Sequence, residues 1–151
     1  MKSEVNKMTA AEYLNQIADL DECIKQDQRR REDKMLMATA GKGIDYSADR
    51  VQTSPSGDTL CKQVCDICDI DEKIKKEINV FIDAKELIIR QIRGLHNVRY
   101  NQVLYGIYVE LKSLNQLALE LCRSERTIQA WRTEALNEFG RAYKSEMKYF
   151  Y

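Results

Sequence analysis

The sequence has few residues that interrupt helices, with one proline and six glycines among 151 residues. Because 32% of the residues are charged as well, this composition favours long helices over a sheet. No apolar run approaches the roughly 18 residues of a transmembrane helix, and the first residues lack the apolar core of a signal peptide. We therefore expect an all-α protein that is cytoplasmic and has no membrane partner.

The chain also lacks net charge, since 24 Lys and Arg balance 24 Asp and Glu. No global field attracts nucleic acid. The balance is uneven along the chain, however, because residues 90–151 carry 10 basic and 6 acidic residues while residues 1–89 carry 14 and 18. The C-terminal part is therefore the expected partner for phosphate groups.

The residue sets that support catalysis are missing. We find no nucleophile beside a base and no paired carboxylates. The glycine-containing stretch Gly41–Gly43 is too short for a phosphate-binding loop. The single histidine, His96, has no ligand or catalytic partner at a suitable spacing. We expect no enzyme activity and no cofactor.

Three of the five cysteines follow the spacing Cys-x3-Cys-x2-Cys, at Cys61, Cys65 and Cys68. This spacing matches the cluster-binding signature of radical enzymes, and it places the three thiols on one helical face. The motif lies inside a heptad helix, however, where cysteine serves as a small buried hydrophobic residue. We interpret the cysteines in this way and expect no metal.

The N-terminal part reads as two long helices that form a hairpin. Thr9 and Glu12 have the spacing of a capping box, which predicts the start of the first helix. A flexible loop is expected at 38–57, and a second helix runs from Asp58 or Thr59 to Gly94. Its apolar residues alternate at spacings of four and three, as in a coiled-coil seam. The seam consists of Leu60, Val64, Ile67, Ile74, Ile78, Phe81, Ile88, Ile92 and Leu95.

This seam is longer than the apolar stripe of the first helix. An apolar stripe left in water is an association site. We therefore predict a long antiparallel, coiled-coil-like hairpin over residues 1–96 that forms a homodimer, a higher oligomer or a complex with another protein.

The C-terminal part carries the pattern of a helix-turn-helix. Ser113 and Ser124 both have N-cap character and lie 11 residues apart, which indicates two short helices rather than one. A preceding helix, with Asn97 as its N-cap, completes a three-helix module over residues 97–151. The loop between the two serine-capped helices contains Cys122 and Arg123.

Helical periodicity predicts which residues of the last helix face outward. The exposed ridge consists of Arg126, Gln129, Ala130 and Thr133, whose side-chain types suit hydrogen bonds and methyl contacts with base edges. Four further residues lie where DNA phosphates would pass. They are Lys112, Arg123, Ser124 and Arg132.

The stretch from Arg99 to Phe139 resembles region 4 of the sigma factors, on the basis of Tyr108, "SLNQLA" (113–118), Ser124 and "TIQAWRTEAL" (127–136). The chain as a whole is similar to small phage proteins with a sigma-like C-terminus, related to phage transcription activators of the RinA/ArpU type. These proteins share a polar loop, here residues 51–58. Three positions depart from the sigma pattern: Cys122 replaces a glycine, Arg123 an apolar residue and Ile107 an arginine.

The resemblance implies a DNA-binding regulator of transcription in the cytoplasm of a bacterial host. Its partners would be double-stranded DNA and RNA polymerase, the latter through the hairpin. One alternative is a protein-interaction module that acts on RNA polymerase in place of sigma region 4, without reading DNA. The other alternative is a component of phage DNA packaging.

Overall fold

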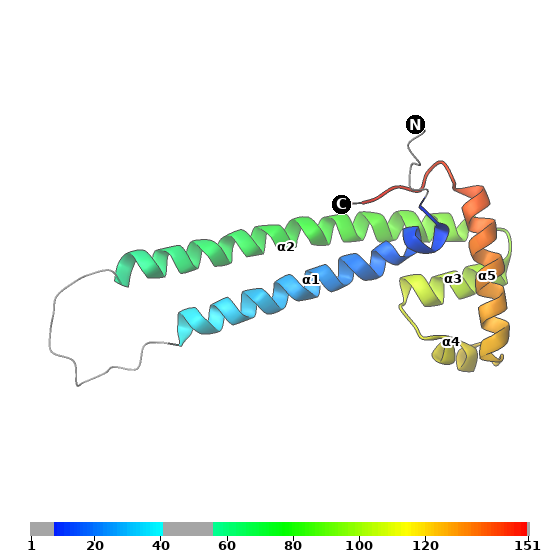
Figure 1. Ribbon diagram of the computed structural model, residues 1–151, viewed down its shortest axis with the longest axis horizontal. Helices are drawn as coiled ribbons and strands as arrows, with labels where there is room; N and C mark the ends of the chain where they lie inside the picture. Colours follow the sequence, from blue (N-terminus) through cyan, green and yellow to red (C-terminus); the bar gives the residue numbers. More distant parts are fainter. Residues whose placement is uncertain (1–7, 41–55, 151) are drawn as a thin grey trace, which may run out of the picture. The chain divides into compact units, whose positions relative to one another are not determined.

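The computed structural model describes residues 8–40 and 56–150, and all regular structure in these two ranges is helical (Figure 1). The helices are α1 (Ala10–Thr39), α2 (Ser56–Arg93), α3 (Val98–Leu104), α4 (Leu114–Glu120) and α5 (Glu125–Ala142). A π-helical turn, η1 (Tyr105–Val109), continues α3. None of these helices is long and apolar enough to cross a bilayer.

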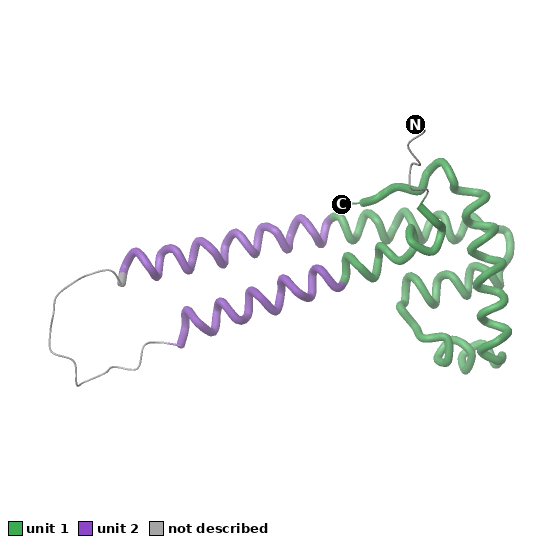
Figure 2. Tube along the Cα trace, in the orientation of Figure 1, with its two compact units in different colours: residues 1–21, 80–151 green, residues 22–79 purple. Residues whose placement is uncertain are grey.

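The loop expected at 38–57 falls mostly on residues 41–55, which lie outside the described residues. Its ends differ slightly from the expectation, because α1 continues to Thr39 and α2 begins at Ser56. The chain divides into two compact units, one of residues 1–21 and 80–151 and the other of residues 22–79 (Figure 2). The predicted division between residues 96 and 97 stays a prediction.

The unit of residues 22–79 pairs a segment of α1 with an antiparallel segment of α2. Its buried apolar residues include Ile24 of α1 and Ile67, Ile70 and Ile74 of α2. Ion pairs connect the two segments in antiparallel order. They join Asp27 to Lys73 at 2.7 Å, Arg31 to Asp71, and Lys34 to Asp66 at 2.9 Å.

The predicted seam is only partly buried. Ile67, Ile74, Ile88, Ile92 and Leu95 are buried, whereas Ile78 and Phe81 are half-buried and Leu60 and Val64 are exposed. The interpretation of Cys61, Cys65 and Cys68 as buried residues is wrong, because all three thiols are exposed. Each cysteine directly follows a seam position. Its side chain therefore lies about 100° around the helix from the seam and faces outward.

The other unit is built on a core to which α1, α2, α3, η1 and α5 all contribute. Its largest fully buried side chains include Tyr13, Ile88, Leu104, Tyr108 and Phe139. A smaller adjoining cluster holds α4 in place, with Val103, Leu117, Ala118 and Ile128 at its centre. Both α3 and α4 contact α5, so this last helix is held along much of its length (Figure 1).

Local side-chain hydrogen bonds set the helix starts. Thr9 and Glu12 form the predicted capping box, in which the Thr9 amide donates to Glu12 Oε2 at 2.7 Å and the Glu12 amide to Thr9 Oγ1 at 3.2 Å. Asn97 caps α3 by accepting from the Arg99 amide at 3.0 Å. Ser113 and Gln116 form a second capping box on α4. These groups satisfy amides that have no partner inside their own helix.

The chain beyond α5 is fastened to α1 by a buried glutamine. Gln16 donates through Nε2 to the Lys148 carbonyl at 2.9 Å and accepts through Oε1 from the Phe150 amide at 3.0 Å. The Phe150 ring also lies 5.5 Å from the Tyr13 ring. Because Gln16 is nearly inaccessible to water, these bonds replace hydration that it would otherwise lose.

Candidate nucleic-acid interface

The interface predicted from the sequence centres on the start of α5. Ser124 caps this helix, since its Oγ accepts from the Thr127 amide at 3.2 Å and lies 2.8 Å from Thr127 Oγ1. A turn over Leu121–Ser124 separates α5 from α4, so the two predicted helices are distinct. Within the turn the Arg123 amide donates to the Ala118 carbonyl at 2.9 Å.

Cys122 is the residue that reverses the chain in this turn. Its φ is 52°, in the left-handed region that side chains disfavour. The resemblance noted above places a glycine here in the sigma pattern, and glycine adopts this conformation without steric cost. The turn therefore forms in this chain, with cysteine in the strained position.

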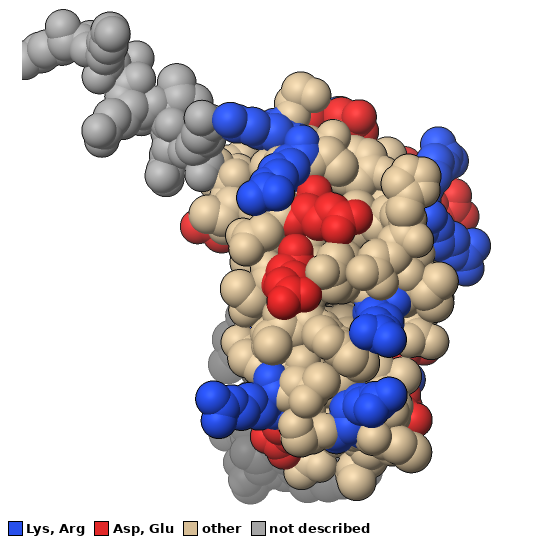
Figure 3. Space-filling model, turned by 90° about the vertical axis from the view of Figure 1, so that its right-hand side faces the viewer, with Lys and Arg blue, Asp and Glu red and all other residues tan. Residues whose placement is uncertain are grey.

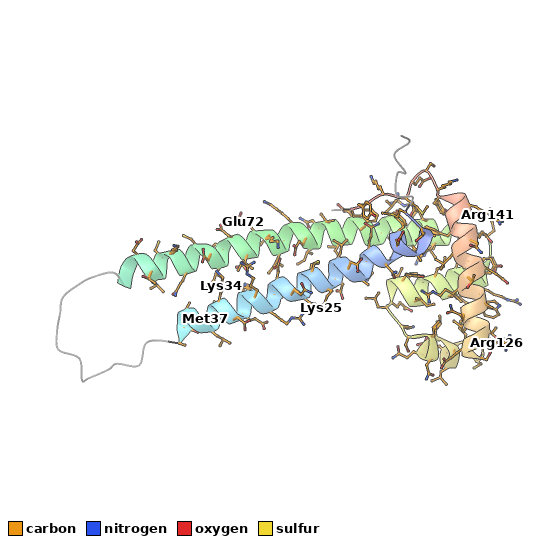
Figure 4. The ribbon with its side chains drawn as sticks, viewed as in Figure 1. Lys25, Lys34, Met37, Glu72, Arg126 and Arg141 are labelled. Carbon is orange, nitrogen blue, oxygen red and sulfur yellow. The ribbon has the colours of Figure 1, made fainter. Side chains whose placement is uncertain are left out.

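The four residues of the predicted ridge are all exposed. Arg126, Gln129, Ala130 and Thr133 lie on the outer side of α5, opposite the buried face that packs into the core. Thr133 Oγ1 donates to the Gln129 carbonyl at 3.1 Å, which ties its hydroxyl to the helix backbone. Figure 4 labels Arg126 near the start of α5 and Arg141 near its end.

The four expected phosphate contacts differ in how far other groups already engage them. Lys112 bridges Glu110 at 2.7 Å and Glu120 at 2.8 Å, and these two carboxylates raise the pKa of its ammonium. Arg132 donates through Nε to the Tyr108 hydroxyl at 3.1 Å and lies over the Tyr108 ring. The Ser124 hydroxyl serves the helix cap.

Arg123 is exposed and makes no ion pair with any described residue. Its guanidinium carbon lies 6.0 Å from the centre of the Trp131 ring. Of the four expected contacts, it is the one whose side chain makes neither a hydrogen bond nor an ion pair with a described residue. Its cation is also held near the start of α5, close to the predicted ridge.

Arg99 is a residue of this surface that the sequence patterns did not single out. Its guanidinium carbon lies 5.4 Å from the centre of the same Trp131 ring. Arg99 and Trp131 are 32 positions apart and belong to α3 and α5. No local pattern joins them, since the contact arises only when α3 docks on α5.

The face around α5 carries both signs of charge. Figure 3 shows basic and acidic side chains interspersed on this side of the molecule rather than a continuous basic patch. α5 itself contains three arginines and three glutamates. Binding through this face would therefore depend on the placement of single arginines more than on a broad positive field.

The other candidate groups of the sequence are its cysteines and His96. Among the parts of the chain that the structure describes, no three His, Cys, Asp or Glu side chains come together as metal ligands. The described cysteines are unpaired thiols. His96 is exposed in the short connection between α2 and α3.

The chain was compared with protein-family models, with curated proteins and with solved structures, and no match was found in any of the three.

Proposed function

We propose that α3, α4 and α5 form a DNA-binding helix-turn-helix and that the protein regulates transcription, in line with its resemblance to sigma region 4. In this proposal α5 enters the major groove of double-stranded DNA. Arg126 and Gln129 hydrogen-bond with base edges, while Ala130 and Thr133 contact thymine methyl groups. The proposal concerns binding and regulation and assigns no catalytic step to the chain.

The observation that carries the proposal is the exposure of the whole ridge on a helix whose opposite face is buried. Ile128, Ala135 and Phe139 anchor α5 in the core. Arg126 and Gln129 stand clear of that core and have no side-chain partner among the described residues. A helix fixed in this way presents its outer side chains in a defined geometry, as base recognition requires.

The hairpin is proposed to supply association with a second copy or with RNA polymerase. Large apolar side chains are exposed where α1 ends and α2 begins, among them Met37 at 73% and Leu60 at 53%. Figure 4 labels Met37 near the end of α1. Val64 is also exposed although it belongs to the seam pattern. Apolar groups gathered in this way favour association. A second subunit would add a second reading helix and thus raise affinity.

The test pairs two arginine variants in a gel-shift titration on selected and random DNA. Arg126→Ala is expected to lose discrimination between the two DNAs by about 1–3 kcal/mol, because it removes a base contact. Arg123→Ala is expected to weaken binding to both DNAs alike and to flatten the salt dependence. Small, equal effects of both variants on every sequence would contradict the proposal.

The second candidate function is contact with RNA polymerase in place of sigma region 4. Its support is Leu119 on the seven-residue helix α4, a large apolar side chain that is 75% exposed. A purified polymerase that retains the wild-type protein but not Leu119→Ser, with no shift of DNA at low salt, would favour this function over DNA reading.

A further inference from the structure

Trp131 is the only tryptophan of the chain, and it lies between the core and the surface. One part of its side chain packs against the cluster that joins α4 to α5, which contains Leu117 and Ile128. The rest is accessible to solvent. The ring is therefore held by the cluster on its buried side and remains accessible to groups at the surface.

Two arginines from separate segments approach this ring. Arg99 comes from the first turn of α3 and Arg123 from the turn before α5, with guanidinium carbons 5.4 and 6.0 Å from the ring centre. Their separation is at most the sum of these two distances. An arginine within about 6 Å of an indole is attracted by the negative face of the ring, so Trp131 restricts both cations to one region.

Neither cation is neutralised by the protein. Arg99 and Arg123 are exposed and form no ion pair within the described ranges. Glu134, an acid of α5, accepts a hydrogen bond from the Tyr100 hydroxyl at 2.8 Å. Two guanidinium groups held near one ring repel each other, and an anion that contacts both would relieve this repulsion.

We infer that Arg99 and Arg123, held by Trp131, form a two-arginine contact for the phosphodiester backbone of duplex DNA. Each guanidinium donates paired hydrogen bonds to phosphate oxygens, for which its planar fork is suited. Trp131 is a positioning residue, since it holds the arginines without touching the phosphates. The inference rests on the proposed DNA-binding function and adds Arg99 and Trp131 to it.

DNA is favoured over an acidic protein partner because Arg123 directly precedes Ser124, the N-cap of the helix that carries the ridge. Arg126 is only three residues from Arg123 and is exposed on the same helix start. Phosphates recur along one strand at about 3.4 Å of axis rise, so two arginines held beside one ring can contact different phosphates of the same strand. Backbone contacts next to base contacts orient a reading helix.

The experiment measures binding of a random-sequence DNA duplex to the full chain over a series of salt concentrations from about 50 mM upward. Arg99→Ala and Arg123→Ala are each expected to reduce the slope of log affinity against log salt by about 0.9, and the double variant by about 1.8. Lys76→Ala, which removes an exposed cation of α2, is the matched control and should leave the slope unchanged.

Trp131 gives a second readout, because all tryptophan fluorescence of the chain comes from it. The duplex is expected to change the emission of the wild type, and to change that of the double variant much less. Trp131→Leu should weaken binding several-fold while circular dichroism shows an intact helical fold, and Trp131→Phe should restore most of the affinity because it retains a ring face.

Distinct results overturn the inference and the proposed function. Failure of the wild type to bind any duplex near 50 mM salt would overturn both. If Arg123→Ala alters the slope but Arg99→Ala does not, or if DNA leaves the Trp131 emission unchanged, only the two-arginine contact is wrong. An emission change with a polyglutamate peptide but not with DNA would assign the arginines to an acidic protein partner.

Discussion

Leu117 of α4 lies directly over Gly106 of η1. A Cβ atom added to Gly106 would stand 2.7 Å from Leu117 Cδ1 and 3.3 Å from Cδ2. Both residues are buried, and Leu117 belongs to the cluster that holds α4 against α5. The missing side chain of Gly106 therefore allows α4 to approach closely and sets the position of the turn that precedes α5.

The first prediction concerns this contact. Gly106→Ala forces the buried Leu117 side chain to move, and overpacking of this kind typically costs about 1–3 kcal/mol. Alanine regains up to about 1 kcal/mol of helix propensity, so the net loss in the free energy of unfolding is expected near 1 kcal/mol. Urea denaturation followed by circular dichroism measures this change.

Gly57 provides the matched control for this substitution. It lies in α2, is exposed, and an added Cβ would meet no atom within 4 Å. Gly57→Ala is therefore expected to stabilise the protein by up to about 1 kcal/mol. If Gly106→Ala were equally stabilising, the close approach of α4 to η1 would be wrong.

The second prediction concerns the strained turn at Cys122, where φ is 52°. Cys122→Gly removes a steric cost of about 1–2 kcal/mol from the folded state. Glycine also makes the unfolded chain more flexible, which lowers the free energy of unfolding by about 0.5–1 kcal/mol. We expect a small net stabilisation, seen as a higher midpoint of urea denaturation. Cys122→Ala keeps the strain and should show no gain, so an equal gain in both variants would attribute the effect to the thiol.

Local chemistry explains why the helix starts could be predicted from the sequence. A cap depends on a side chain and an amide only two or three residues away, as at Ser113 with Gln116 and Ser124 with Thr127. The break between α4 and α5 and the outward side of α5 follow from the same short-range patterns.

Contacts between distant segments could not be predicted in this way. The ion pairs of Lys112 depend on how α4 returns beside the end of η1, and the Arg99 contact with Trp131 depends on the docking of α3. The exposed cysteines illustrate the same point. A heptad pattern predicts which residues form the apolar stripe of a helix, but the burial of the residues next to that stripe depends on which segments cover them. Side chains at the edge of a stripe are therefore the least certain to be buried.

The third prediction concerns stability at alkaline pH. Burial raises the pKa of the Tyr13 hydroxyl above its ordinary value of 10.0, and the nearby Glu146 carboxylate raises it further. A pKa raised in the folded state gives stability that is present below the unfolded pKa and is lost as the pH rises through the folded pKa. The free energy of unfolding should thus fall above about pH 10.

Tyr13→Phe isolates this contribution. The variant loses the 3.0 Å hydrogen bond from the Tyr13 hydroxyl to Gln91 Oε1, so it is expected to be less stable at neutral pH. Its stability should nevertheless decline less steeply between neutral and alkaline pH than that of the wild type. Parallel declines in urea denaturation across this range would show that Tyr13 ionises equally in both states.

The fourth prediction concerns the charge of Lys112, which Glu110 and Glu120 compensate. The double variant Glu110→Gln, Glu120→Gln frees this cation to contact a phosphate. Its slope of log affinity against log salt on duplex DNA should become steeper by about 0.9. A charge-matched control is Glu32→Gln with Glu72→Gln, two exposed glutamates of the other unit.

The control variant separates a released contact from a general gain in positive charge, because both double variants change the net charge equally. A steeper slope in the Lys112 variant alone, reversed when Lys112→Ala is added, would place this lysine at a phosphate. If both double variants gain slope equally, the effect is one of overall charge, and Glu110 and Glu120 do not restrain DNA binding. If neither gains slope, Lys112 lies away from the DNA and its ion pairs serve only to hold α4.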